Sequence, residues 1–280
     1  MVKTPYECIR DKLQDNMPSH LLSLIPSKWE KIGEVLILKI PEKTASYRQE
    51  IAKVYAEVLG CKSVLEGVGG IEGECREPKV NHIYGDKDTE TVHVENRVRY
   101  KLDPSKIMFS SGNMSERIRM STIVDENETV VDMFAGIGYF SIPIAVYSTP
   151  KKVYAIEMNP TAYHYLCSNI TLNNVNHIVK PLLGDNREVT PKGVADRVIM
   201  GYLRETYRYL PTAFASLRNR GIIHYHEVCP NEFLETRPFQ RIKEAAKQFS
   251  LHITGVKKRI IKSYAPGVSH VVLDVDLERG

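Results

Sequence analysis

The apolar and polar positions of the chain follow two different rhythms, which change near residue 105. Before that point the pattern is mixed: it predicts a strand at residues 34–40, a helix at 47–59 and an alternating strand at 91–100. The helix places its apolar residues on one face, and Gly60 follows it as a C-cap candidate. We therefore expect a small mixed α+β domain in the N-terminal part.

After residue 105, predicted strands alternate with predicted helices. The strands lie at residues 129–134, 152–157, 178–183, 195–200, 221–228, 254–263 and 270–275. The helices lie at residues 114–123, where Asn113 could be the cap, and at 139–148, 160–173, 210–217 and 238–249. Such alternation is typical of βαβ units, which build a mostly parallel sheet with helices on both faces. The sequence therefore predicts a doubly wound α/β domain at residues 101–280 behind a small domain at 1–100.

Composition narrows the choice of class without changing the fold prediction. The 280 residues carry a formal net charge of +4, which permits a nucleic-acid partner but does not demand one. The five cysteines are scattered, which argues against a disulfide framework or a structural zinc site and suits a reducing cytoplasm. They are Cys8, Cys61, Cys75, Cys167 and Cys229. We expect a soluble protein, because the chain has neither an apolar signal-peptide core nor a membrane-length apolar run.

The first predicted strand of the second domain runs into the segment DMFAGIGYF, residues 132–140. Such a glycine loop can bind a dinucleotide, bind S-adenosylmethionine, or simply turn a strand into a helix. A dinucleotide fingerprint needs a third small residue for close packing, and Ser141 fits that position poorly. Asp132 would repel a pyrophosphate, whereas it could hold the ammonium group of an amino acid. These residues favour S-adenosylmethionine.

Two further acids end the next two predicted strands. Glu157 follows Gly138 by 19 residues, where an acid that binds ribose hydroxyls belongs. Asp185 ends the third strand, where it could accept a hydrogen bond from an adenine amino group, or merely cap the following helix. Three acids in register at strand ends strengthen the prediction of a nucleoside site.

These segments resemble two related families of tRNA-modifying enzymes. One contains the class I S-adenosylmethionine-dependent methyltransferases that act on N1 of guanosine 37. The other contains the wybutosine-pathway tRNA aminocarboxypropyltransferases. The similar segments, within roughly residues 90–280, are MFSSGNMSERIRM (108–120), DMFAGIGYF (132–140), YAIEMNP (154–160), LLGDNRE (182–188), ADRVIMGY (195–202) and SYAPGVSHVVLDV (263–275).

The resemblance implies a Rossmann-like fold of the class I methyltransferase type, with S-adenosylmethionine as group donor and no metal. It also implies that the anticodon loop of tRNA(Phe) is the partner, with no obligate protein partner. The cofactor-binding residues that it implies are Ser110, Arg117, Asp132, Phe134, Gly136, Glu157, Met158, Asp185, Asn186 and Gly201.

Two departures from the methyltransferase pattern distinguish the branches. Residues 200–203 read MGYL where those enzymes have an Asn-Leu-Pro-like turn, and residues 109–112 read FSSG where they have an F-S-P-R-like run. Both departures resemble the aminocarboxypropyltransferase branch, which acts on 4-demethylwyosine at position 37. A glycine at position 201 would also enlarge the site near the transferred group.

Glu116 matches the position of a base proposed for the methyltransferases. It also lies three residues after Asn113, so that N-x-x-E reads as a capping box, which we favour. The histidines of GIIHYHEV, His224 and His226 beside Glu227, lack the three converging ligands of a metal site. We expect them to be ordinary strand-end histidines.

Basic and aromatic residues could contact RNA. The segment VKKRIIKSY (256–264) carries four cations and a tyrosine, which could neutralise phosphates and stack on a base. Four further cations could join it in a basic rim: Arg97, Arg99, Lys101 and Lys106. Tyr139 and Tyr202 could receive a base that is flipped out of its stack, or could pack in the core.

Three other functions compete with aminocarboxypropyl transfer. A tRNA guanosine-37 N1-methyltransferase would use the same fold and cofactor. A non-catalytic RNA-binding protein would retain a decayed cofactor fold, against which the three intact acids argue. A nicotinamide dehydrogenase is disfavoured by Asp132 and Ser141.

Overall fold

The structure of the protein is a computed structural model that describes residues 3–73 and 77–280. By internal contacts the chain forms two compact units, Met1–Ser111 and Gly112–Gly280. The domain boundary expected at residue 100 remains a prediction. Cys75 lies outside the described residues, and the other four cysteines are free thiols.

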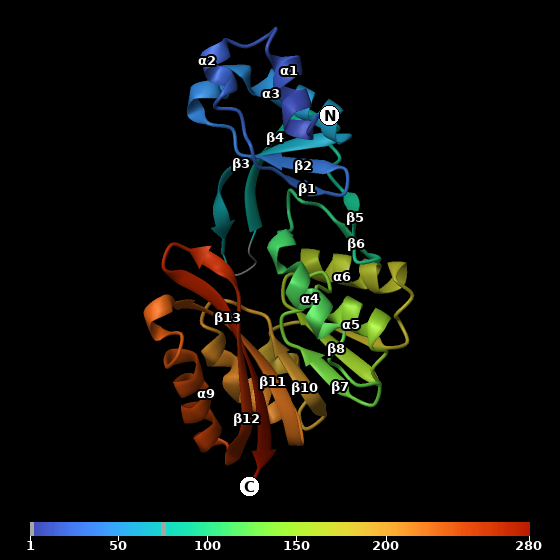
Figure 1. Ribbon diagram of the computed structural model, residues 1–280. Helices are drawn as coiled ribbons and strands as arrows, with labels where there is room; N and C mark the ends of the chain where they lie inside the picture. The colour runs from blue at the N-terminus through green and yellow to red at the C-terminus, as the bar shows by residue number, and fades with distance from the viewer. Residues whose placement is uncertain (1–2, 74–76) are drawn as a thin grey trace. The chain divides into compact units, whose positions relative to one another are not determined.

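The N-terminal unit combines helices with a mixed sheet (Figure 1). Its helices are α1 (Pro5–Leu13), α2 (Ser19–Leu22), the 3₁₀ turn η1 (Glu42–Tyr47) and α3 (Arg48–Leu59). Its strands are β1 (Glu30–Ile32), β2 (Val35–Leu38), β3 (Ser63–Glu72), β4 (Glu77–Gly85), β5 (Thr91–Glu95) and β6 (Val98–Leu102). Among the described residues, β1 to β4 form one sheet in chain order. Helix α3 confirms the predicted helix, and Gly60 ends it in the left-handed conformation at φ 62°.

The single strand expected at residues 91–100 is wrong, because the chain turns back on itself there. Strands β5 and β6 form an antiparallel hairpin in which Glu95 pairs with Val98. The two turn residues, Asn96 and Arg97, have φ values of 46° and 61°. Positive φ at both central residues is what a two-residue hairpin turn of type I′ requires. Arginine in the second place hides this turn from a search for Asn-Gly.

The second unit, all of which is described, is the predicted doubly wound sheet (Figure 1). Its strands are β7 (Thr129–Asp132), β8 (Lys152–Glu157), β9 (Val179–Leu183), β10 (Ala195–Met200), β11 (Leu217–Pro230), β12 (Leu251–Ala265) and β13 (Val268–Arg279). Its helices are η2 (Ser111–Asn113, at the boundary), α4 (Met114–Met120), α5 (Ser141–Tyr147), α6 (Pro160–Leu172), α7 (Asn186–Val189), η3 (Thr206–Tyr209), α8 (Leu210–Ser216), η4 (Asn231–Phe233) and α9 (Arg237–Gln248).

The order of these strands determines where a ligand can bind. They are arranged β12-β13-β11-β10-β7-β8-β9, and β7 to β11 run parallel, whereas β13 runs antiparallel to both of its neighbours. The chain proceeds outward from β7 through β8 to β9 and then returns to β10 on the other side of β7. The order therefore reverses between β7 and β10, and ligands of such sheets bind outside the carboxyl ends of the strands at that point.

Helices cover both faces of this sheet, as the periodicity predicted (Figure 1). Helices α5 and α6 contact β8 and β9, whereas α8 and α9 contact β10, β11 and β12. The apolar core between the sheet and α8 and α9 contains the fully buried side chains of Phe214, Ile223, Tyr225 and Val275. No helix among the described residues is long and apolar enough to cross a membrane.

Candidate functional site

The glycine loop begins where β7 ends, at the reversal point of the sheet. Gly136 and Gly138 have φ values of 57° and 98°, which favour glycine. A Cβ atom on Gly136 would lie 2.5 Å from the ring of Tyr139, and one on Gly138 would lie 2.4 Å from Ile142. Both glycines are therefore required by the path of the backbone and by the side chains packed against it.

Glu157, at the end of β8, holds this loop from the neighbouring strand. Its Oε2 accepts a hydrogen bond from the Gly136 N–H at 2.8 Å, and its Oε1 accepts one from the Asn159 N–H at 2.8 Å. Burial raises the pKa of the carboxyl group. A carboxylate offers about four acceptor positions, so its two oxygens keep capacity to accept from a ligand. Two adjacent acceptors fit two neighbouring hydroxyl groups, such as those of a ribose.

Asp132, the last residue of β7, is fully buried and bound by its own loop. Its Oδ2 accepts a hydrogen bond from the Ser141 hydroxyl at 2.6 Å, and its Oδ1 accepts a longer one from the Phe134 N–H at 3.4 Å. The acid thereby joins the strand end to the first residue of α5. Ser141, the residue that fits a dinucleotide fingerprint poorly, is thus the partner of the strand-end acid. The expected contact of Asp132 with an ammonium group remains a prediction.

Because Asp132 is buried, we expect the free energy of unfolding to depend on pH. Burial raises the pKa of Asp132 from its ordinary value of 3.8 to about 6, so the folded state binds the proton more tightly than the unfolded chain. Its contribution to the free energy of unfolding therefore falls as the pH rises through that interval, by about 3 kcal/mol in all. The variant Asp132→Asn lacks this titration.

Urea unfolding at about pH 3.5 and about pH 7 tests the effect of Asp132. The free energy of unfolding of the wild-type protein, relative to that of Asp132→Asn, should fall by about 3 kcal/mol from the lower to the higher pH. Parallel pH profiles for the two proteins would contradict the prediction.

Asp185 and Asn186 follow β9 at the same edge of the sheet. Asp185 is the N-cap of α7: it accepts from the Arg187 N–H at 2.9 Å and also pairs with the Arg187 guanidinium. The hydrogen bonds from Arg187 lower the pKa of Asp185. Asn186 donates through Nδ2 to the carbonyl of Met133 at 3.2 Å, while its buried Oδ1 has no partner among the described residues. A buried acceptor without a partner is expected where a ligand supplies the donor.

Aromatic side chains gather at the ends of β7 and β10. The ring of Phe134 stacks on that of Tyr202, with centroids 5.1 Å apart, and meets Tyr209 edge to face at 5.0 Å. A Cβ atom at Gly201 would lie 3.1 Å from the ring of Phe140. The space beside this glycine is therefore bordered by Phe140, and the expected enlargement of the site near the transferred group remains a prediction. Met158, after β8, is 46% exposed.

Helix α4 differs from the prediction at both ends. It stops at Met120, because the hydroxyl groups of Ser121 and Thr122 bond to carbonyls three residues back. At its start, Asn113 makes no side-chain capping bond, so the predicted capping box with Glu116 is wrong. Glu116 is instead 2% exposed, and both of its oxygens accept hydrogen bonds from the guanidinium group of Arg119, at 2.6 and 2.8 Å.

The other predicted residues of this segment fall in different units. Arg117 is buried within α4 of the second unit, at 3% exposure. Ser110 belongs to the first unit, where its neighbour Phe109 packs on the rings of His93 and Tyr100. The structure therefore brings together the predicted residues of the strand ends, and the cofactor role of Ser110 remains a prediction.

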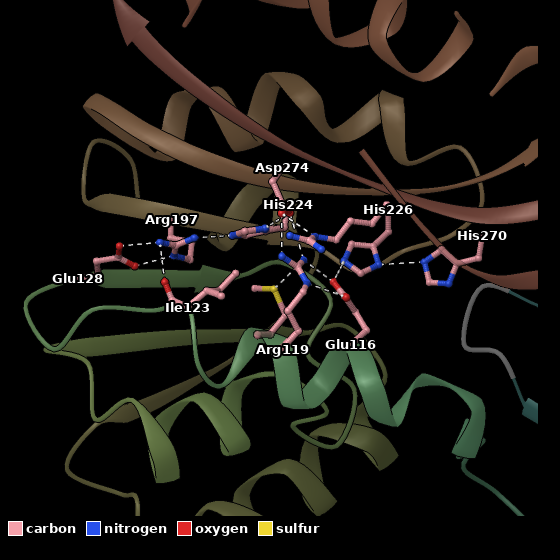
Figure 2. Close-up of polar contacts among 11 residues, drawn as sticks. Glu116, Arg119, Ile123, Glu128, Arg197, His224, His226, His270 and Asp274 are labelled. Carbon is pink, nitrogen blue, oxygen red and sulfur yellow. Dashed lines mark hydrogen bonds and ion pairs between the residues drawn. The ribbon is translucent and has the colours of Figure 1, made fainter. Parts of the chain in front are cut away.

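His224 and His226 are not strand-end residues, because β11 continues to Pro230. Both are 1% exposed and lie inside a polar network that sequence reasoning missed (Figure 2). Nδ1 of His226 lies 3.1 Å from Nε2 of His270, and burial followed by the charge of His270 lowers the pKa of His226 well below its usual value. No group of three or more possible metal ligands occurs among the residues that the structure describes.

The fold and the site together define a class of protein. A glycine loop at the reversal point of a doubly wound sheet, with acids at the ends of β7, β8 and β9, defines a nucleoside-binding α/β transferase of the class I methyltransferase type. Comparison with known proteins identifies the family. Residues 91–254 match the TRM5/TYW2 methyltransferase domain, and residues 9–89 match the TYW2 N-terminal domain. The chain belongs to the TRM5/TYW2 family.

Individual relatives cover nearly the whole chain. The chain is 51% identical over 252 residues to the tRNA(Phe) (4-demethylwyosine(37)-C(7)) aminocarboxypropyltransferase of Methanocaldococcus jannaschii, covering 90% of this chain and 98% of the relative. It is 38% identical over 260 residues to the tRNA (guanine(37)-N(1))-methyltransferase Trm5b of Pyrococcus abyssi, covering 92% and 77%. The crystal structure of P. horikoshii TYW2 in complex with MeSAdo superposes with a TM-score of 0.89 at 41% identity, covering 98% of this chain and all of that one.

Proposed function

We propose that this protein transfers the α-amino-α-carboxypropyl group of S-adenosylmethionine to 4-demethylwyosine at position 37 of tRNA(Phe). The observation that carries the proposal is the 51% identity to the M. jannaschii aminocarboxypropyltransferase, which extends over 98% of that enzyme. The identity to the methyltransferase relative is lower, at 38% over 77% of its length. The sequence departures at residues 109–112 and 200–203 favour the same branch.

The strand-end residues fit the nucleoside half of S-adenosylmethionine. The free acceptor positions of Glu157 would receive the two ribose hydroxyls, while its backbone partners keep the loop in place. The orphaned Oδ1 of Asn186 would accept from the adenine amino group, beside the Asp185 cap. Met158, whose exposed side chain follows Glu157, would cover the adenine face.

Residues around the methionine arm decide which group is transferred. Bound S-adenosylmethionine supplies a sulfonium with three carbon–sulfur bonds open to in-line displacement. A site that fixes the adenosine and turns the arm therefore selects the product by position alone. Gly201, bordered by Phe140, and the buried Arg117 are the residues that we assign to this arm.

The second substrate, after S-adenosylmethionine, is the anticodon loop of tRNA(Phe). The proposal includes no obligate protein partner and places the reaction in the cytoplasm. Lys257, Lys258 and Arg259 are exposed on β12, the edge strand of the large sheet. Lys258 also pairs with Glu235, and Arg259 lies 3.7 Å from Asp274. Cations on one strand can follow a phosphate backbone. Of the other predicted cations, Lys101 and Lys106 form ion pairs within the first unit, with Glu90 and Asp103.

Removing the two lysines of this strand should weaken tRNA binding. The double variant Lys257→Ala/Lys258→Ala should raise the KM for tRNA by about five-fold and make its dependence on the logarithm of salt concentration shallower by about one to two. The value of kcat should not change. Steady-state kinetics at several salt concentrations provide the measurement.

A charge-matched control distinguishes local contact from net charge. Lys151 and Lys192 are exposed just before the amino ends of β8 and β10. Lys151→Ala/Lys192→Ala should leave the KM for tRNA and its salt dependence unchanged. Equal effects of the two double variants would refute a specific contact at β12.

The by-product of the reaction tests the proposed function. Transfer of the aminocarboxypropyl group breaks a different carbon–sulfur bond from methyl transfer and leaves 5′-methylthioadenosine. Methyl transfer leaves S-adenosylhomocysteine. Chromatography after incubation with tRNA(Phe) that carries 4-demethylwyosine should therefore detect methylthioadenosine in an amount equal to the modified tRNA. S-adenosylhomocysteine as the stoichiometric by-product would overturn the proposal in favour of the methyltransferase alternative.

A further inference from the structure

Arg119 joins helix α4 to β13, the last strand in the sequence, as Figure 2 shows. One side of its guanidinium group donates to both oxygens of Glu116, at 2.6 and 2.8 Å. The other side donates to both oxygens of Asp274 on β13, at 2.7 and 3.1 Å. The planar fork of an arginine suits such bidentate contacts, and a lysine cannot reproduce them. Arg119 therefore fixes the position of α4 relative to β13.

Asp274 is in turn held by a histidine whose tautomer is determined by its neighbours. Nε2 of His224 lies 2.7 Å from Nη1 of Arg197, and a guanidinium group can only donate. Nε2 of His224 must therefore be the acceptor, so its proton lies on Nδ1 and is donated to Asp274 at 2.6 Å. Arg197 is fixed by Glu128, at 2.6 and 2.7 Å. The whole chain of contacts therefore has one arrangement of donors and acceptors.

The charges in this series of contacts favour the pairing of Asp274 with Arg119. Burial disfavours the ionised form of Asp274, but the hydrogen bond from His224, followed by the hydrogen bond and charge of Arg119, outweighs it and holds the pKa of Asp274 well below its usual range. Arg259 lies on the exposed side of the same carboxylate, at 3.7 Å. A buried ion pair is weak evidence for stability, since apolar residues often replace one without loss. Its better attested use is to specify one geometry.

A series of contacts leads from Glu116 to the proposed transfer site. Nε2 of His226 lies 4.0 Å from Oε1 of Glu116 and has no hydrogen-bond partner among the described residues. The ring of His226 packs against that of Phe140 at 5.5 Å, and Phe140 borders Gly201. The position of α4 is thereby linked through packed side chains to the glycine turn after β10.

We propose that Asp274 and Arg119 are positioning residues for the transferase reaction. Together they hold α4 in the place where Arg117 meets the methionine arm of S-adenosylmethionine. The inference rests on the proposed function, because it takes the cofactor site from there. It adds two residues, on α4 and β13, that act through others and do not touch the cofactor.

Calorimetric titration of the full-length protein with S-adenosylmethionine tests this proposal. Asp274→Asn leaves Arg119 with one anionic partner and replaces one acceptor oxygen with an NH₂ group, so α4 loses its bidentate, charged attachment to β13. The dissociation constant of S-adenosylmethionine and its KM should rise at least ten-fold, whereas the KM for tRNA should change less than two-fold. Arg119→Lys keeps the charge but not the fork and should have the same effect. The double variant should bind S-adenosylmethionine no more weakly than the single variant with the lower affinity, because the two residues act as a unit.

Glu227 provides a matched control for the loss of a buried acid. It is 2% exposed on β11 and binds Arg237 and Arg241 of α9, at 2.8 and 2.7 Å, away from α4. Glu227→Gln should lower the melting temperature as much as Asp274→Asn and leave the dissociation constant unchanged. Wild-type affinity in folded Asp274→Asn or folded Arg119→Lys, or equal weakening by Glu227→Gln, would overturn the proposal. A wild-type protein that binds no S-adenosylmethionine would instead refute the proposed function.

Discussion

Replacing Gly136 with alanine is expected to weaken S-adenosylmethionine binding by about a hundred-fold, which corresponds to about 2.7 kcal/mol. The new Cβ atom would lie 2.5 Å from the ring of Tyr139 on a backbone with φ of 57°. Either the ring or the loop must move, and a moved loop withdraws the Gly136 N–H from Glu157. Calorimetric titration of the purified variant gives the affinity.

Gly193 is a control position that distinguishes the effect of backbone strain from the effect of the clash with Tyr139. Its φ is 65°, close to that of Gly136, but a Cβ atom there would meet no atom within 4 Å. Gly193→Ala should therefore lose about 1 kcal/mol of stability, from the left-handed backbone alone, and keep wild-type affinity. If Gly136→Ala also binds with wild-type affinity, the loop does not contribute to the cofactor site.

The substitution Glu157→Gln should reduce binding by a similar factor through a different cause. An amide places an NH₂ group where one carboxylate oxygen now accepts from Gly136 or Asn159, so two donors face each other. The same change removes one acceptor from the ribose hydroxyls. We expect the dissociation constant for S-adenosylmethionine to rise about a hundred-fold, since an unpaired buried donor costs about 1–3 kcal/mol in addition to the lost ligand bond.

Asp196 offers the matched control, because it makes a similar backbone contact at the opposite edge of the sheet. Its Oδ2 accepts from the Thr129 N–H at 2.8 Å. Asp196→Asn should lower stability modestly and leave cofactor affinity unchanged. Equal losses of affinity in both variants would show that Glu157 acts only through folding.

The sequence predicted the strand-end acids because they depend on local order alone. In a parallel sheet the carboxyl ends of successive strands share one edge, so Asp132, Glu157 and Asp185 were expected to lie together. The separate roles of these acids could not be read in the same way. Asp132 is occupied by Ser141 and Asp185 by Arg187, and these contacts depend on side-chain orientation.

The two capping boxes show why a local pattern is insufficient. Thr4 and Glu7 form one at the start of α1, a helix that the sequence reading did not identify. Asn113 and Glu116 have the same spacing and do not form one. The difference is tertiary, because Arg119, held by Asp274 from the far end of the chain, takes both oxygens of Glu116.

The buried network was missed for the same reason. Asp274 stands between Leu273 and Val275 in an apolar strand, and His224 and His226 stand in another. A charged residue inside an apolar strand signals a buried partner, but not which one. The pairing of β11 with β13 places His224 opposite Asp274, and that register is a property of the whole sheet.

The most direct test of the account uses two preparations of S-adenosylmethionine, one labelled in the methyl group and one in the carboxyl carbon. Each is incubated with the protein and tRNA(Phe) that carries 4-demethylwyosine, and with unmodified tRNA(Phe) in parallel. We predict that carboxyl label enters the precursor tRNA and that methyl label enters neither tRNA. Methyl label in unmodified tRNA, without carboxyl label in the precursor, would contradict the account and identify a guanosine methyltransferase.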